Sequence, residues 1–285
     1  MANSYTEKKG KKVESIILLI KYLALVIAGF VMIYPMFWVL LNSFKDNNDI
    51  YAHPFSLPTV WRVDNYIDTL TTSHFNISFL NSTIVTLSTI VVTILVCSMA
   101  SYAIARVDFK FNFAVLAFFL LGLMVPTVSC LLPLFILYQK VKMINSLVTL
   151  IIIYSSTGMS TNILMITGFM KSIPKEIEES AIIDGSNMPR VFWSFIIPLS
   201  RVVIVTVAIL TFLWTWNEYL FGLVFISKPL LKTLPVALAG FKTAHQVFYG
   251  PMSAGIVITV IPVVLVYTIL QEQVIKGMTM GAVKG

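Results

Sequence analysis

Charge is scarce in this sequence: Asp, Glu, Lys and Arg together make up only 12% of the 285 residues. Soluble domains carry about 25% charged residues, so a chain this poor in charge has too few polar groups for a water-facing surface. Hydrophobic residues reach 58%, and the mean hydropathy is +0.88. The composition therefore excludes an ordinary soluble domain and points to lipid as the solvent.

Cysteine and histidine are also rare, which leaves little material for a disulfide framework or a metal site. The two cysteines, Cys97 and Cys130, each lie inside an apolar run and are interpreted as small hydrophobic residues. The three histidines, His53, His74 and His245, stand alone without ligand spacing, and we interpret them as solvated loop residues. The sequence predicts no metal site.

Catalytic machinery is missing from the sequence. No Gly-x4-Gly-Lys-Ser/Thr phosphate loop occurs, so we expect that the chain does not hydrolyse ATP itself. No pattern resembles a nucleophile paired with its base, which predicts a protein without catalytic residues or a cofactor of its own. The net charge of +7 comes without a basic patch interleaved with aromatic residues, and this disfavours nucleic-acid binding.

Long apolar runs are what the sequence has in abundance. A membrane-spanning helix needs about 20 predominantly apolar residues, and several segments are long enough. Their length and weak alternation disfavour barrel strands, so we predict an all-α membrane protein with six transmembrane helices. Prolines inside the runs are tolerated, because neighbouring helices satisfy the freed carbonyls. The predicted spans are roughly Ile16–Leu41, Asn81–Ala105, Phe113–Tyr138, Leu147–Phe169, Val202–Ile226 and Ser253–Leu270.

The placement of the two termini follows from these spans. The lysine-rich start resembles the flank of a signal peptide, but the first run is too long for one, so we expect a retained helix. Of the 20 Lys and Arg residues, 13 fall on the side of the N-terminus and 7 on the other, which predicts that both termini are cytoplasmic. The expected organisation is a cytoplasmic tail (1–15), a first helix (16–41), an extracytoplasmic loop (42–80), a helical core (81–271) and a cytoplasmic tail (272–285).

The cytoplasmic segment 171–201 is the most informative part of the sequence. Pro174 suits a first helical position, and three glutamates place negative charge in the turns that follow. Gly185 suits the stop just past the end of this helix. We therefore predict a helix of about three turns, a turn at 186–188 and a second helix that begins at Pro189.

The short helix needs a partner to bury its apolar face. Ile177, Ser180 and Ala181 share one face, whereas Lys175 and Glu178 lie elsewhere. A helix this short is marginal alone in water. A lipid surface is one alternative, but the polar face is acidic and suits anionic headgroups poorly, so a protein partner is favoured.

One spacing in this segment matches a known signature. Glu179-Ser180-Ala181 is followed after three residues by Gly185 and, nine residues later, by Phe195-Ile196-Ile197-Pro198. This resembles the loop Glu-Ala-Ala-x3-Gly-x9-Ile-x-Leu-Pro of ABC importer permeases, with small departures that keep the spacing. The resemblance implies the type I ABC importer permease fold, in which the short helix between the fourth and fifth spans is a coupling helix that docks in a groove of an ATPase subunit. It implies this coupling role for Glu179, Ser180, Ala181, Asp184, Gly185 and Pro198.

The resemblance extends along nearly the whole chain. Segments similar to the sugar-importer branch of the family are Asn42–Lys45, Pro54–Pro58, Tyr102–Arg106 and Trp216–Tyr219. The tail from residue 277 onward is similar to the end of the smaller, six-helix permease of maltose-type importers. The resemblance therefore implies half of a path for a sugar or oligosaccharide across a bacterial cytoplasmic membrane. The implied partners are a second related permease, two ATPase subunits that bind ATP and Mg²⁺, and an extracytoplasmic solute-binding protein.

Polar residues inside the predicted spans are few, and each has two interpretations. Ser156 and Ser160 belong to a hydroxyl-rich stretch that serves either close helix packing or the lining of a solute path. Asn217 and Glu218 form either part of a path or gate, or an interfacial anchor beside neighbouring aromatic residues.

Two other functions remain open at the level of sequence. A permease for glycerol phosphate or another polar solute is the nearest rival, although no Arg lies inside a predicted span, which favours a neutral solute. An ion-coupled secondary transporter needs internal repeats and buried ionisable pairs. The sequence shows no clear repeat and, apart from Glu218, little charge inside the spans.

Overall fold

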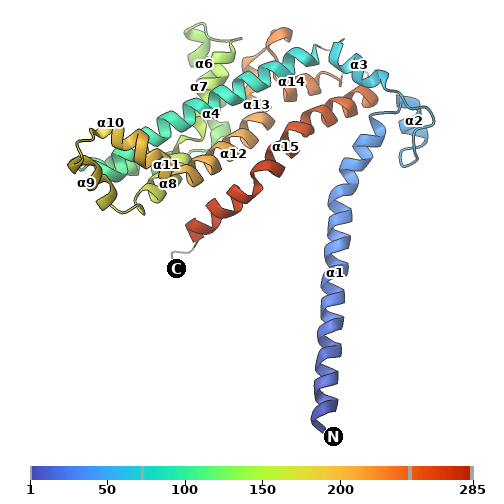
Figure 1. Cartoon of the computed structure of the whole chain (residues 1–285). Helices are drawn as coiled ribbons and strands as arrows, with labels where there is room; N and C mark the ends of the chain where they lie inside the picture. Colours follow the sequence, from blue (N-terminus) through green and yellow to red (C-terminus); the bar gives the residue numbers. More distant parts are fainter. Residues whose placement is uncertain (1, 72–73, 243–245, 283–285) are drawn as a thin grey trace. The chain divides into compact units, whose positions relative to one another are not determined.

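The computed structural model describes the backbone of residues 2–71, 74–242 and 246–282 (Figure 1). Side chains are described for residue 14 and for residues 16–71, 74–242 and 246–272. Within these ranges the chain is helical, and an isolated bridge between Lys242 and Val247 is its only extended pairing.

The α-helices, in chain order, are α1 (Ala2–Asn42), α2 (Asn47–Ala52), α3 (Asp64–Thr71), α4 (Phe75–Arg106), α5 (Asn112–Gly122), α6 (Leu131–Lys140), α7 (Leu147–Thr157), α8 (Met159–Met170), α9 (Glu176–Ile183), α10 (Met188–Val191), α11 (Ile197–Leu199), α12 (Arg201–Asn217), α13 (Leu220–Phe225), α14 (Leu234–Ala239) and α15 (Tyr249–Ala282). Short 3₁₀ turns lie at Thr127–Cys130 and Pro229–Leu231, and a π-helical turn lies at Phe192–Ile196.

The apolar helices match the predicted number of spans. Three continuous helices are long and apolar enough to cross a membrane: Ile16–Asn42, Phe75–Arg106 and Tyr249–Glu272. Counting each bent helix pair as one further span gives up to six in the described residues, as predicted. The bent pairs are Asn112–Gly122 with Thr127–Lys140 (91°), Leu147–Thr157 with Met159–Met170 (50°) and Met188–Leu199 with Arg201–Asn217 (75°).

At one of the three bends the sequence interrupts helical hydrogen bonding. Pro126 lies in the break between α5 and α6, and its missing N–H removes a donor there. Gly158 separates α7 from α8, and Ser200 separates α11 from α12. Pro35 and Pro262, in contrast, lie inside the continuous helices α1 and α15, as a membrane helix tolerates.

The predicted bounds of the fifth span, 202–226, are wrong. Helix α12 ends at Asn217, and α13 is a separate short helix. Length and composition instead pair α12 with the residues before it, 188–199. Hydrophobicity alone does not reveal the break, because the residues of α12 and of α13 are both apolar.

The chain forms two compact units, one of residues 1–69 and 241–257 and the other of residues 70–240 and 258–285. In the first unit, buried polar side chains hold the segment that follows α1. Lys45 is fully buried, and its ammonium donates to the carbonyl of His53 (2.8 Å). The Asn65 amide donates to the carbonyls of Ser43 and Lys45, both at 2.9 Å.

The start of α15 joins this polar cluster in the first unit. The Asn47 amide donates to the Val247 carbonyl (2.7 Å), and its oxygen accepts from the Tyr249 N–H (2.9 Å). A Cβ added at Gly250 would lie 2.5 Å from the Lys45 carbonyl oxygen, closer than side chains approach. Two residues of the Asn42–Lys45 motif, Ser43 and Lys45, therefore have a structural role: they hold the segment after α1 beside the beginning of α15.

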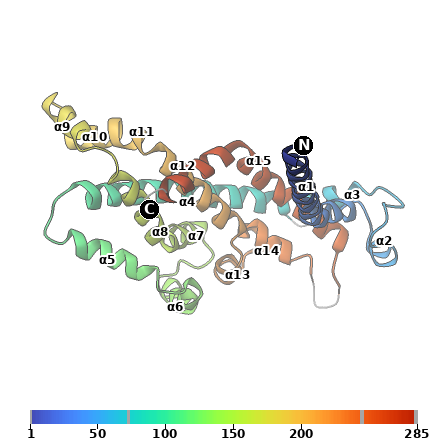
Figure 2. The same ribbon diagram turned by 90° about the horizontal axis from the view of Figure 1, so that it is seen from below.

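Helix α4 is the centre of the second unit. It packs against α7, α8 and α12, as the two views in Figures 1 and 2 show. Small and hydroxyl side chains dominate its buried face, and they let neighbouring helices approach closely. The small or polar members of this face are Ser78, Asn81, Ser82, Thr86, Thr89, Thr93, Cys97, Ser98 and Ser101, and the larger apolar members are Phe75, Val85 and Ile104.

Candidate functional sites

Helix α9 is the predicted short helix of the segment 171–201, and it is shorter than expected. It runs from Glu176 to Ile183, which is eight residues or about two turns. Pro174 lies outside it, so the helix begins two residues later than the sequence suggested. The three glutamates lie in its first turn, where they complement the positive end of the helix dipole.

Gly185 ends α9 as predicted. Its φ of +84° lies in the left-handed region, which a residue with a Cβ adopts at a cost. The Gly185 N–H bonds to the Ile182 carbonyl and the Ser186 N–H to the Ala181 carbonyl, both at 2.9 Å. These two bonds form a Schellman motif, so the glycine fixes the direction in which the chain leaves the helix.

The second helix of the segment begins where the sequence indicated. Asn187 caps α10, since its side-chain oxygen accepts from the N–H of Arg190 (3.0 Å). Pro189 lies in the first turn of α10, as expected. The π-helical turn at 192–196 follows, and Pro198 lies in α11 just before the 75° bend. Pro198 thus belongs to the bend rather than to α9.

Helix α9 turns one face toward its own chain and the other outward. Ala181 is 4% exposed and Glu178 is 8% exposed, and these two residues, three apart, form the inner face. The predicted division of faces is wrong on this point, because Glu178 was expected on the polar side and Ser180 beside Ala181. The exposed residues of α9 and the turn after it are Glu176, Glu179, Ser180, Ile182, Ile183, Asp184 and Gly185, and Ile183 has an exposed fraction of 85%.

Glu178 is buried because a cation meets it. One of its carboxylate oxygens lies 2.7 Å from Nε of Arg106, the last residue of α4, and both side chains are largely inaccessible. The hydroxyl of Tyr102 donates to the other oxygen (3.3 Å). The Arg106 guanidinium also donates to the Ile173 carbonyl (2.6 Å).

Sequence reasoning missed this cluster. Arg106 and Tyr102 stand in the Tyr102–Arg106 segment noted above, but Glu178 is more than 70 residues away in the chain. The signal that was available is an Arg directly after an apolar run together with three glutamates in one short helix. Which glutamate turns inward is decided by packing alone.

Glu218 is placed as a helix cap at the break between α12 and α13. Its carboxylate accepts from the backbone N–H groups of Phe221 (2.8 Å) and Gly222 (3.1 Å) and from the hydroxyl of Tyr154. Three donors satisfy it, so the structure brings Glu218 into a structural network. Its neighbour Asn217 is exposed, and its amide donates to the Leu213 carbonyl within the same helix (2.7 Å).

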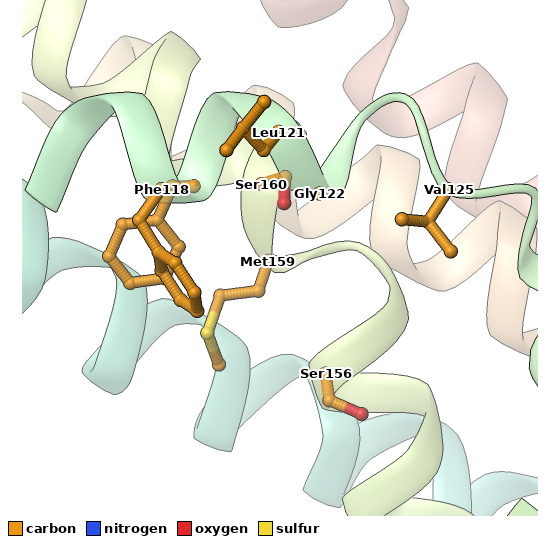
Figure 3. Close-up of a pocket in the computed structure, with 8 residues that line it drawn as sticks. Phe118, Leu121, Gly122, Val125, Ser156, Met159 and Ser160 are labelled. Carbon is orange, nitrogen blue, oxygen red and sulfur yellow. The ribbon is translucent and has the colours of Figure 1, made fainter. Parts of the chain in front are cut away.

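Ser156 and Ser160 both line one hollow beside the α7–α8 break. The hollow measures about 370 Å³, and Figure 3 shows both serines with their mostly apolar neighbours. The Ser156 hydroxyl donates to the Ile153 carbonyl of its own helix (2.8 Å). At Ser160 two helices lie so close that a Cβ added at Gly122 would clash with the Ser160 hydroxyl oxygen. The lining residues are Phe118, Phe119, Leu121, Gly122, Val125, Ser156, Met159 and Ser160.

A family model matches most of the second unit. Residues 97–280 match the family described as "Binding-protein-dependent transport system inner membrane component". The match begins inside α4 and includes α9, the capping residue Glu218 and most of α15.

Similar proteins are known over nearly the full length. The probable ABC transporter permease protein YurM of Bacillus subtilis is 32% identical over 252 residues, which is 88% of this chain and 84% of that protein. The diacetylchitobiose uptake system permease protein NgcG of Streptomyces coelicolor is 31% identical over 92% of this chain and 87% of its own.

One solved structure has the same fold. It is a bacterial ABC transporter involved in the import of the acidic polysaccharide alginate. The TM-score is 0.81 with 19% sequence identity, and the match covers 90% of this chain and 96% of the other.

Proposed function

The chain belongs to the family of binding-protein-dependent transport system inner membrane components, and from this premise we propose that it forms half of the path for a sugar or oligosaccharide in an ATP-driven importer. The observation that carries the proposal is the geometry of α9. One face is fixed to the chain, while acidic and apolar side chains cover the exposed face. A permease whose sequence has no nucleotide-binding loop must receive energy from a partner, and an exposed face of this kind can receive it.

The exposed face of α9 supplies the docking surface for a cytoplasmic ATPase subunit. Ile182 and Ile183 stand between Glu179 and Asp184 in the sequence, and all four are exposed, so the partner groove should have both apolar and basic groups. Ser180 keeps this face small, and Gly185 turns the chain away from the groove. Two residues of the signature lie away from this exposed face. Ala181 is small and lets α9 pack closely against the rest of its own chain, and Pro198 lies in α11 just before the bend.

The mechanism is alternating access, driven by two ATPase subunits that bind ATP and Mg²⁺. Their closure moves α9, and differential contacts in the open and closed states bias the path toward one side of the membrane. The chain itself holds no cofactor and catalyses no reaction. The other half of the path is a second related permease, and an extracytoplasmic binding protein delivers the solute.

The sugar class of the substrate is supported by two observations. The relative NgcG, whose name gives diacetylchitobiose as its solute, is similar over 92% of this chain. A second relative, whose name gives trehalose and maltose as its solutes, is similar over 91% of this chain. Ser156 and Ser160 are the candidate lining of the path, and exposed Asn217 is a candidate contact near its gate, whereas Glu218 supports the break beside it.

Co-purification tests this function. We expect the chain, extracted gently from a bacterial cytoplasmic membrane, to bring down a second permease and an ATPase whose hydrolysis rises with one sugar-loaded binding protein. A chain that is recovered alone and transports under an ion gradient without ATP contradicts the proposal.

A matched pair of variants locates the docking face. Ile183→Asp places a charge on the most exposed apolar residue of α9, and we expect recovery of the ATPase subunit to fall about tenfold, as 1.4 kcal/mol of lost binding gives. Val60→Asp makes the same change at a residue of the outer loop that is 65% exposed, and recovery should stay at the wild-type level. Equal recovery from the two variants would place the docking surface elsewhere.

A further inference from the structure

We propose that Arg106 and Glu178 act as a clamp that fixes α9 to the end of α4, so that movement of α9 is delivered to the central helix of the second unit. The inference rests on the proposed function for the partner that moves α9. It adds the positioning residues that carry the movement onward, which the coupling signature does not include.

The contacts of the clamp come from three separate segments. Arg106 pairs with Glu178 of α9 at 2.7 Å and donates to the carbonyl of Ile173, in the link between α8 and α9, at 2.6 Å. Tyr102, one turn earlier in α4, reaches the second carboxylate oxygen of Glu178 at 3.3 Å. One guanidinium therefore holds both the helix and the link that leads into it. A planar group with several donors fixes direction as well as distance.

Burial makes the ion pair strong, and it also makes the loss of either partner costly. The accessible fraction is 5% for the Arg106 side chain and 11% for that of Glu178, so water screens the pair weakly. Removing one partner leaves a buried charge without compensation, whereas an apolar pair of similar volume would stabilise packing equally well. The charged pair therefore adds a defined geometry that apolar packing lacks.

The ends of the two helices favour the same pairing. Arg106 is in the last turn of α4, where the helix dipole favours a cation. Glu178 is in the first turn of α9, where the dipole favours an anion. The links on both sides of α9 are short and largely exposed, at 171–175 and 184–187, so without the clamp they could absorb a displacement of α9. With the clamp, α9 and α4 move together.

Hydrogen exchange in the purified importer complex measures directly whether the clamp holds α9 in place. Glu178→Gln keeps the shape of the side chain and removes its charge. We expect amide exchange in residues 176–184 to rise by about tenfold or more through local opening, while exchange within α4 stays unchanged. Glu176→Gln removes an exposed charge from the same helix and is the matched control, with exchange as in the wild type.

Uptake and hydrolysis measure the consequence for transport. In Glu178→Gln the ATPase subunits should still be recovered and should hydrolyse ATP at the basal rate, while stimulation by loaded binding protein and sugar uptake fall about tenfold, a change equal to 1.4 kcal/mol of coupling. The variant Arg106→Met with Glu178→Met keeps the interior packed without charge. It should assemble and unfold at a temperature no lower than that of Glu178→Gln, which leaves the Arg106 charge unpaired, yet show the same loss of stimulation.

Two results overturn the clamp. Exchange of α9 in Glu178→Gln equal to that in Glu176→Gln shows that the pair does not hold the helix. Wild-type uptake per ATP hydrolysed in the double methionine variant shows that transmission does not pass through it. Both results leave the proposed function intact. That function is contradicted instead by a wild-type chain that recruits no ATPase subunit. In that case the exchange measurement still shows whether the ion pair holds α9.

Discussion

Gly185 is the residue at which local backbone geometry and the proposed function meet most closely. Its φ of +84° and the Schellman bonds behind it fix where α9 stops. No heavy atom lies within 4 Å of an added Cβ, so a substitution there strains the backbone without a clash. The effect of a larger residue is therefore on the angle at which the chain leaves α9.

Substitution of this glycine should uncouple transport. In Gly185→Val, a β-branched residue at positive φ costs roughly 1–2 kcal/mol, and the end of α9 shifts to relieve it. We expect sugar uptake to fall strongly while part of the ATPase remains bound, measured by uptake and co-purification on the same preparation. Gly168→Ala, in the exposed interior of α8 with open space around it, should leave both unchanged. Wild-type uptake by Gly185→Val would contradict the role given to this turn.

Glu218 is a carboxylate at the break between two apolar helices, and its contacts are structural. Glu218→Gln keeps the volume of the side chain but replaces one acceptor oxygen with a donor nitrogen. One of the two N–H groups, on Phe221 or Gly222, then loses its partner, at roughly 1–3 kcal/mol for an unsatisfied buried group. We expect a lower unfolding temperature for the purified protein. Tyr219→Phe, at the exposed neighbour, is the control and should unfold as the wild type does. An unchanged temperature in Glu218→Gln would show that the cap is dispensable.

At the scale of elements, the beginning of α15 depends on a glycine for its approach to the segment after α1. Gly250→Ala places a Cβ 2.5 Å from the Lys45 carbonyl oxygen and 2.7 Å from the Asn65 amide nitrogen. Neither group can retreat freely, because Asn65 holds the Lys45 carbonyl and Lys45 is fully buried.

The substitution should destabilise the first unit. Overpacking of this kind costs about 1–3 kcal/mol, and we expect Gly250→Ala to unfold at a lower temperature in detergent. The matched control is Gly29→Ala, since a Cβ added at Gly29 in α1 would meet no heavy atom within 4 Å. Equal unfolding temperatures for the two variants would show that the backbone at Lys45 shifts to make room for the added Cβ.

Helix α4 has a packing role that its hydrophobicity alone does not predict. The apolar run predicts that it crosses the membrane, and the structure makes it the helix against which α7, α8 and α12 pack. Its hydroxyl-bearing face explains why so many Ser and Thr residues occur in an apolar run. Small side chains permit close packing where lipid offers no hydrophobic driving force between helices.

At the scale of the whole molecule, the charge bias predicts the orientation in the membrane. In a background with Cys97 and Cys130 changed to Ala, a membrane-impermeant maleimide should label Trp61→Cys in intact cells. It should label Glu14→Cys only after the membrane is opened. Both positions are exposed within the chain, so the difference reports the side of the membrane. Labelling of Glu14→Cys in intact cells would reverse the predicted topology.

The sequence by itself determined the features that depend on neighbours along the chain. Apolar runs of spanning length gave the helical class and up to six spans, because the bilayer requires backbone groups to be satisfied within each segment. The spacing from Glu179 to Pro198 indicated the family, which the match to residues 97–280 confirms. The stop at Gly185 followed from backbone sterics alone.

Tertiary structure decided the features that depend on residues distant in the chain. The inward turn of Glu178 needs Arg106, the burial of Lys45 needs Asn65 and Gly250, and the break at Glu218 draws on Tyr154. Hydropathy gives each of these residues the same value in every context. The free energy of a buried polar group, in contrast, is set by the partner that packing brings to it, and only the folded chain identifies that partner.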